Sequence, residues 1–115
     1  MLLKILYVDD ELDLLDIFKD MFTSPVLEVM ICNKASDVKS IIQLNPPDLL
    51  LLDYRMPEMN GDQLAQVIAP FLPSSVPIAL VTGDIEVKTQ YKFHKVFKKP
   101  YDINAMQDYF DSLKK

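Results

Sequence analysis

Short hydrophobic runs alternate with segments of helical periodicity along this chain. Five of these runs are bounded by polar or turn-forming residues, which is typical of buried strands. These predicted strands cover residues 2–8, 26–32, 49–52, 77–82 and 95–98. The third consists of four leucines, as expected of a strand that is buried on both faces. The fifth has a lysine at each end, which predicts a short strand at an edge of the sheet.

Amphipathic segments separate these strands. Apolar residues at helical spacing predict helices near 11–22, 36–45, 61–69 and 102–113, and the first has Leu12, Leu15, Phe18 and Phe22 in its apolar stripe. Residues 83–93 leave room for only a short fourth helix, which must be cut to about two turns or unwound. Strands that alternate with helices favour a parallel sheet with right-handed crossovers. We therefore predict one α/β domain over residues 1–115, a doubly wound five-stranded parallel sheet of flavodoxin-like order 2-1-3-4-5, with a shortened fourth helix.

Length and composition exclude several protein classes. At 115 residues the chain has room for one domain, and 50% hydrophobic with 25% charged residues excludes intrinsic disorder. The single cysteine, Cys32, excludes an internal disulfide and a cysteine-rich zinc site, and its strand context predicts a buried, inert thiol. No apolar run approaches the length of a membrane span, and no export signal is visible. We expect a soluble protein located in the cytoplasm.

The charge is unevenly distributed. The formal net charge is −5, but residues 1–84 carry −8 and residues 85–115 carry +3. An acidic body argues against nucleic acid as the main partner, because affinity for DNA comes mostly from neutralising phosphates. The lysines at 88, 92, 95, 98 and 99 are a local exception, and we expect Lys88, Lys92 and Lys95 to bind an acidic protein surface.

Polar groups follow the predicted strands at one end of the sheet. Asp9 and Asp10 follow the first strand, Asp53 the third, and Lys99 the fifth, while Thr82 ends the fourth. The carboxyl ends of parallel strands form the ligand crevice in such sheets. Three carboxylates at close quarters need a compensating cation, and Mg²⁺ with oxygen ligands suits them. Asp53 is then a candidate nucleophile toward a phosphoryl group, which Thr82 and Lys99 are placed to bind.

Five sequence features together carry a family resemblance. With these features the chain resembles the receiver domain of two-component response regulators, of the chemotaxis-regulator type, over essentially its whole length. The features are Asp9-Asp10, Asp53 with Met56-Pro57 and Gly61, Thr82-Gly83, and Lys99-Pro100.

The resemblance implies a role for each site residue. Asp53 would accept a phosphoryl group from a histidine kinase or phosphotransfer protein, and the only catalysis would be of its own phosphorylation and dephosphorylation. Asp10 and Asp53 would ligate Mg²⁺ directly, Asp9 largely through water, and Arg55 through its backbone carbonyl. Thr82 and Lys99 would bind the phosphoryl oxygens. The resemblance also implies a Lys99–Pro100 bond that is often cis, and output through contacts with a downstream protein effector.

Two features depart from the family pattern. Val96 stands where the family usually has an aromatic residue that reports phosphorylation, and Phe97 follows it, facing the opposite side of the strand. Only sixteen residues separate Thr82 from Lys99. Both departures fall on the output face of the family. Arg55 and Asp84, each two residues past a site residue, are expected to pair across the crevice mouth.

Two alternatives come from other functional classes. A phosphohydrolase of the haloacid-dehalogenase type also uses an aspartate nucleophile, but its acid/base two residues later is missing here, where Tyr54-Arg55 follow Asp53. The other alternative is a receiver-like module that binds a partner without being phosphorylated. Val96 favours this alternative, whereas the presence of Asp9, Asp10 and Asp53 argues against it. The sequence leaves open a stand-alone receiver and a fragment of a longer regulator.

Overall fold

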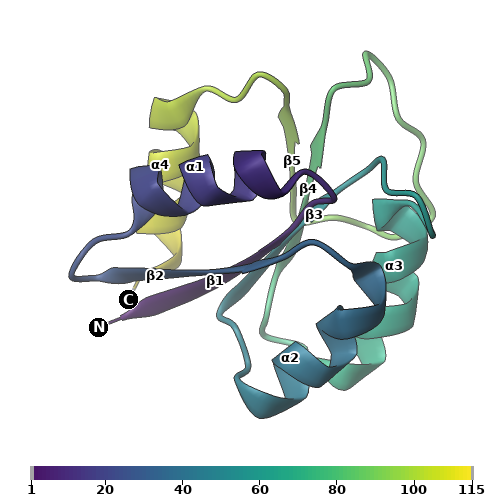
Figure 1. Ribbon diagram of the computed structural model, residues 1–115, viewed down its shortest axis with the longest axis horizontal. Coiled ribbons are helices and arrows are strands. Elements are labelled where there is room, and N and C mark those ends of the chain that lie inside the picture. The colour runs from purple at the N-terminus through teal and green to yellow at the C-terminus, as the bar shows by residue number, and fades with distance from the viewer. Residues whose placement is uncertain (1, 115) are drawn as a thin grey trace.

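The computed structural model describes residues 2–114, and its five strands form a single parallel sheet. The strands stand in the order β2-β1-β3-β4-β5, and every neighbouring pair is parallel (Figure 1). In chain order they span Leu3–Val8, Leu27–Cys32, Leu49–Asp53, Ile78–Thr82 and Lys95–Lys98. The predicted fold class, the strand order and the edge position of the fifth strand are confirmed.

Helices cover both faces of this sheet. Helices α1 (Leu12–Phe22) and α4 (Ile103–Leu113) lie on one face, and α2 (Val38–Leu44) and α3 (Gly61–Ile68) on the other (Figure 1). Short 3-10 turns precede α2 and follow α3, at Ala35–Asp37 and Ala69–Phe71. Within residues 2–114, none of the helices combines the length and the apolar character that crossing a membrane requires.

The alternation of side chains along each strand divides the core into two layers. In β3, Leu49 and Leu51 pack with α1 and α4, while Leu50 and Leu52 pack with α2 and α3. All four leucines are completely buried. A strand between two helical layers meets apolar surroundings on both sides, which explains the unbroken leucine run.

The apolar stripe of α1 is narrower than its sequence predicts. Leu15, Phe18 and Phe22 are buried against the sheet and α4, but half of Leu12 is exposed to solvent. Leu12 is the first residue of the helix, so it lies at the end of the layer rather than over the sheet.

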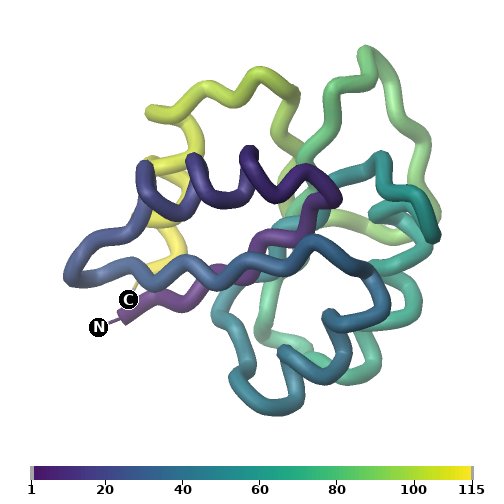
Figure 2. The backbone as a smooth tube through the Cα atoms, in the orientation of Figure 1, coloured from purple at the N-terminus to yellow at the C-terminus, as the bar shows by residue number. Residues whose placement is uncertain are grey.

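The predicted fourth helix is absent. In the part of the chain that the structure describes, the segment from Gly83 to His94 between β4 and β5 contains no helix, and Figure 2 shows it as an irregular green arch that returns beside α3. The Asp62 carboxylate in α3 accepts the N–H groups of Gln90 and Tyr91 at 3.0 and 2.8 Å. The Lys98 ammonium donates to two carbonyls of the same segment, those of Asp84 and Ile85.

The composition of this segment explains why it does not form a helix. Its apolar residues stand two apart, as Ile85 and Val87 and as Tyr91 and Phe93, and this is not helical spacing. Its β-branched residues also lower helix propensity. Side chains from α3 and β5 satisfy backbone groups that a helix would otherwise pair with one another.

Candidate functional site

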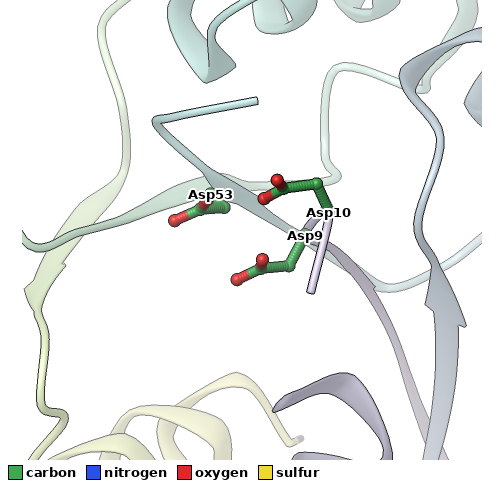
Figure 3. A group of neighbouring side chains, drawn as sticks. All are labelled: Asp9, Asp10 and Asp53. Carbon is green, nitrogen blue, oxygen red and sulfur yellow. The ribbon is translucent and has the colours of Figure 1, made fainter. Parts of the chain in front are cut away.

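Three carboxylates meet at the carboxyl ends of β1 and β3. Asp9 and Asp10 follow the last residue of β1, and Asp53 is the last residue of β3. One oxygen from each of the three lies within 4.8 Å of the others, and Figure 3 shows the side chains gathered at this point. Asp9 is completely buried and Asp53 nearly so, whereas Asp10 is exposed. The sheet order makes β1 and β3 neighbours, and this brings together residues 44 positions apart.

Lys99 joins two of these carboxylates. Its ammonium nitrogen lies 2.8 Å from Asp53 Oδ1 and 3.0 Å from Asp9 Oδ2. Burial works to lower the pKa of the Lys99 ammonium, but the hydrogen bonds to both carboxylates outweigh burial, and the pKa stands above its usual value. Lys99 therefore stays charged and neutralises part of the acidic pocket.

Asp53 is an unusually basic carboxylate. Burial raises the pKa of Asp53 to about 6, although the hydrogen bond from Lys99 opposes the rise. The charge of Asp9 and, less strongly, of Asp10 adds to it. A cation near these carboxylates would remove the repulsion between them.

Both oxygens of Asp9 are occupied by protein donors. Oδ1 accepts the Glu11 N–H at 3.0 Å, and Oδ2 accepts the Tyr7 hydroxyl at 3.1 Å in addition to Lys99. The Tyr7 oxygen in turn lies 3.1 Å from the hydroxyl of Tyr101. Neither tyrosine is among the site residues predicted from the sequence, because an aromatic residue in a strand pattern indicates a core position. Tyr7 stands two residues before Asp9, and Tyr101 stands two residues after Lys99. In extended backbone, residues two apart face the same side, so this spacing was the signal that could have indicated them.

Thr82 and Arg55 lie on the β4 side of the pocket. Thr82 is the last residue of β4 and is buried, and its hydroxyl oxygen accepts the Asp84 N–H at 3.0 Å, so its own proton is free to donate. The Arg55 side chain donates from Nε to Asp84 Oδ1 at 2.9 Å, which confirms the expected pairing. Both members of this pair line an open cavity of about 490 Å³ that also includes Asp10.

Gly61 is required by the close approach of α3 to β3. A Cβ atom at this position would lie 2.5 Å from the carbonyl oxygen of Asp53. The Gly61 N–H donates to the Tyr54 carbonyl at 2.8 Å, and Asn60 caps α3 by accepting the Gln63 N–H. The loop after Asp53 is therefore held against the start of the helix.

The donor set fits a hard divalent cation. Carboxylate oxygens are the ligands that Mg²⁺ prefers, and the exposed Asp10 leaves room for the waters that this ion retains. His94 contributes nothing here, because it is exposed and its Nδ1 lies 2.6 Å from the Tyr109 hydroxyl. Cys32 is buried, and burial raises the pKa of its thiol, which agrees with the predicted inert role.

The β5 geometry agrees with one further expectation. Val96 is 46% exposed, whereas Phe97 is buried and packs on Tyr109. The two side chains therefore face opposite sides of the strand, as predicted. The Lys99–Pro100 peptide bond is cis, also as expected.

Comparison with known proteins gives a family match. A family model described as "Response regulator receiver domain" matches residues 5–111. The protein-glutamate methylesterase/protein-glutamine glutaminase of Pyrococcus horikoshii is 37% identical over 85 residues, which cover 70% of this chain and 22% of that protein. The transcriptional regulatory protein BaeR of Escherichia coli is 32% identical over 83 residues, which cover 72% of this chain and 34% of that protein. The chain thus spans about a third or less of these curated relatives.

A solved structure agrees with the fold. The response regulator receiver domain (CheY-like) from Methylobacillus flagellatus superposes with a TM-score of 0.87 over 99% of this chain and 100% of that one. The two sequences are 18% identical, so this likeness concerns the fold alone.

Proposed function

The chain belongs to the response regulator receiver family, and on this premise we propose that Asp53 accepts a phosphoryl group from a phosphohistidine of a sensor kinase or phosphotransfer protein. A receiver is a phosphoaccepting signalling module rather than an enzyme acting on other substrates, and its family implies a kinase partner. The observation that carries the proposal is the acidic pocket of Asp9, Asp10 and Asp53, with the Lys99 ammonium 2.8 Å from Asp53.

The proposed step transfers a phosphoryl group from an imidazole nitrogen of the donor to a carboxylate oxygen of Asp53. An oxygen of the ionised Asp53 carboxylate attacks phosphorus, the bond from phosphorus to the donor imidazole breaks, and the imidazole leaves with the electron pair. The three non-bridging oxygens of the transferred phosphoryl group, which share two negative charges, would then lie beside the pocket. Lys99 and the free hydroxyl proton of Thr82 are the groups that we assign to bind them.

We assign the metal role to Asp9, Asp10 and Asp53, together with the backbone carbonyl of Arg55. Mg²⁺ held there would neutralise the charge shared between the carboxylates and the transferring phosphoryl group. Asp10 and Asp53 are assigned as direct ligands and Asp9 as a ligand acting largely through water. The protein's own contribution is to hold these oxygens together before any phosphoryl donor arrives.

Phosphorylation by a small donor tests this assignment. Incubation with acetyl phosphate and Mg²⁺ is expected to raise the intact mass of the protein by one phosphoryl group. Asp53→Asn removes the nucleophilic oxygen and should abolish the adduct, and omission of Mg²⁺ should slow its formation. Asp16→Asn, a change at an exposed position in α1, serves as the matched control and should be phosphorylated normally. An adduct of equal yield on Asp53→Asn would contradict the proposal.

Output to another protein is the second part of the proposed function. We treat residues 1–115 as one receiver domain whose phosphorylation is read by a downstream protein effector, and the cytoplasmic location stays a prediction. Lys88, Lys92 and Lys95 are exposed, and none of the ion pairs found within residues 2–114 involves them. These three lysines, here called the lysine face, are assigned to an acidic surface of that effector.

Charge reversal tests the lysine face. Changing all three lysines to glutamate should lower retention of the partner in a pull-down by the phosphorylated protein, because like charges would then face each other. Retention by the unmodified protein should fall as salt is raised. Reversal of Lys19, Lys34 and Lys39, which lie on or near α1 and α2, is the matched control. Equal retention by the lysine-face variant would place the output surface elsewhere.

A further inference from the structure

Tyr7 places a buried polar group on β1, an interior strand of the sheet. Its side chain is completely buried, and its ring packs edge-on against Phe18 with centroids 4.7 Å apart. The hydroxyl nevertheless has two polar partners, Asp9 Oδ2 and the Tyr101 hydroxyl, each at 3.1 Å. A valine or leucine would fill an apolar strand position without having to satisfy a buried hydroxyl. The hydroxyl therefore calls for an explanation beyond packing.

The number of available protons sets the direction of this hydrogen-bond chain. An ionised carboxylate can only accept, so the single hydroxyl proton of Tyr7 is donated to Asp9. The Tyr7 oxygen must then accept from Tyr101, whose own proton points inward. Burial also raises the pKa of both phenols, so they remain neutral donors.

Tyr101 ties the same chain to the segment that carries Lys99. It stands two residues after Lys99, and its ring packs on Phe18 and Tyr7 with centroids 6.0 and 6.5 Å apart. The segment from Lys99 to Tyr101 therefore contacts β1 and its acidic end twice. One contact is the ammonium of Lys99 on Asp9 Oδ2, and the other is the Tyr101 hydroxyl on Tyr7.

We propose that Tyr7 and Tyr101 are positioning residues for the phosphorylation pocket, with Tyr101 acting only through Tyr7. Together they fix Asp9 Oδ2 toward Lys99 and Asp53, while the Glu11 N–H holds Oδ1. The pocket is thereby oriented before a cation or phosphoryl donor binds. This inference rests on the proposed function of the pocket, and neither tyrosine touches the reacting atoms.

Removal of single hydroxyl groups tests the proposal, with MgCl₂ alone as the probe. Mg²⁺ binding is followed by NMR on the side-chain carboxyl carbons of ¹³C-labelled aspartates. Tyr7→Phe keeps the ring but removes the donor to Asp9, and it should weaken Mg²⁺ binding about ten-fold, as expected for loss of a group that orients a metal ligand. Tyr101→Phe should weaken binding less. The double variant should match Tyr7→Phe, because Tyr101 has no route to Asp9 without the Tyr7 hydroxyl.

Tyr109→Phe is the matched control, because it removes a hydroxyl from another buried tyrosine. The Tyr109 hydroxyl forms a hydrogen bond with His94 and not with any residue of the pocket. Tyr109→Phe should leave Mg²⁺ affinity unchanged even if it lowers the unfolding midpoint as much as Tyr7→Phe does. A Tyr101→Phe effect that persists undiminished in the Tyr7→Phe background would overturn the proposed order of action. Unchanged Mg²⁺ affinity in Tyr7→Phe would overturn the positioning role while leaving the proposed function intact.

A second measurement uses the metal-free protein. The Asp9 carboxyl signal should be a single sharp resonance in the unmodified protein and should broaden or shift in Tyr7→Phe, because the carboxylate loses one of its donors. Tyr109→Phe should leave it unchanged. If the unmodified protein failed to bind Mg²⁺ or to be phosphorylated, the proposed function would be wrong. The metal-free signal would still decide whether Tyr7 holds Asp9, since an Asp9 resonance that is identical in Tyr7→Phe would exclude that contact.

Discussion

At the scale of single residues, the pocket balances one partly buried ammonium against two buried carboxylates. Lys99 bridges Asp9 and Asp53, while Asp10 remains exposed at the mouth. The meeting of Asp9, Asp10, Asp53, Thr82 and Lys99 at one end of the sheet was predictable because each is a polar residue at the end of an apolar strand. Tyr7 and Tyr101 were not, since the hydrogen bonds of a buried hydroxyl depend on neighbours that are distant in sequence.

The raised pKa of Asp53 predicts how the stability of the metal-free protein depends on pH. The carboxyl has a pKa of about 6 in the folded protein, against an ordinary value of 3.8. The folded state therefore favours the protonated form, and the free energy of unfolding should fall as pH rises from about 4 to about 6. Asp53→Asn removes this penalty and should stabilise the protein at pH 7 by about 1–3 kcal/mol.

Urea unfolding in EDTA at a series of pH values measures this effect. The gain in free energy of unfolding from Asp53→Asn should shrink toward zero below about pH 4, because the protonated Asp53 and the asparagine that replaces it are then both uncharged. Asp16→Asn should show no comparable gain at any pH. Lower stability of Asp53→Asn than of the unmodified protein at pH 7 would show that the contact with Lys99 outweighs burial.

The Arg55–Asp84 pair predicts a slow loss of the phosphoryl group. The two side chains meet at 2.9 Å on the wall of the open cavity beside Asp10, and we expect them to hinder a water molecule that approaches the phosphoryl group. Replacing both with alanine should shorten the lifetime of the phosphorylated form about five-fold, and each single alanine should do nearly the same, since either breaks the pair. The time course of intact mass after removal of acetyl phosphate measures this lifetime.

The exposed residues Lys19 and Asp20 on α1 provide the control. Alanine at both positions changes the charge in the same way but away from the cavity, and it should leave the lifetime unaltered. If the lifetime were equal in the Arg55→Ala/Asp84→Ala protein, the pair would not shield the phosphoryl group.

At the scale of elements, the segment from Gly83 to His94 is the part that sequence analysis misjudged. The strands and the other helices were predictable because apolar residues recur along the sequence with the period of the buried face of a strand or helix. This segment lies outside both core layers for most of its length, and Ile85 is 97% exposed. Its path is determined by contacts with Asp62 and Lys98, which no local pattern reveals.

Asp62 is expected to hold this segment against α3. Asp62→Ala removes the acceptor for the N–H groups of Gln90 and Tyr91 and should cost about 1–3 kcal/mol of folding stability. Asp62→Asn retains one acceptor oxygen and should cost less. Hydrogen exchange at the Gln90 and Tyr91 amides should accelerate in the same order, and Asp108→Ala, at an exposed position in α4, should leave both rates unchanged. Unaltered exchange in Asp62→Ala would mean that other contacts hold the segment.

At the scale of the whole molecule, the sheet order joins the reactive groups. The order β2-β1-β3-β4-β5 places the ends of β1 and β3 side by side, and β4 and β5 bring Thr82 and Lys99 to the same end of the sheet. The opposite end of the sheet has a cavity of similar size, about 480 Å³, that is lined by none of the predicted site residues. The carboxyl end of the sheet therefore gathers the three acidic residues together with Thr82 and Lys99.

The central claim is that Asp53, and no other residue, carries the phosphoryl group. The most direct measurement is borohydride reduction of the protein after treatment with acetyl phosphate and Mg²⁺, followed by peptide sequencing by mass spectrometry. Reduction converts an aspartyl phosphate to homoserine and leaves an unmodified aspartate unchanged. We expect homoserine at position 53 only, and only when acetyl phosphate is present. Homoserine at position 9 or 10, or none at position 53, would contradict this claim.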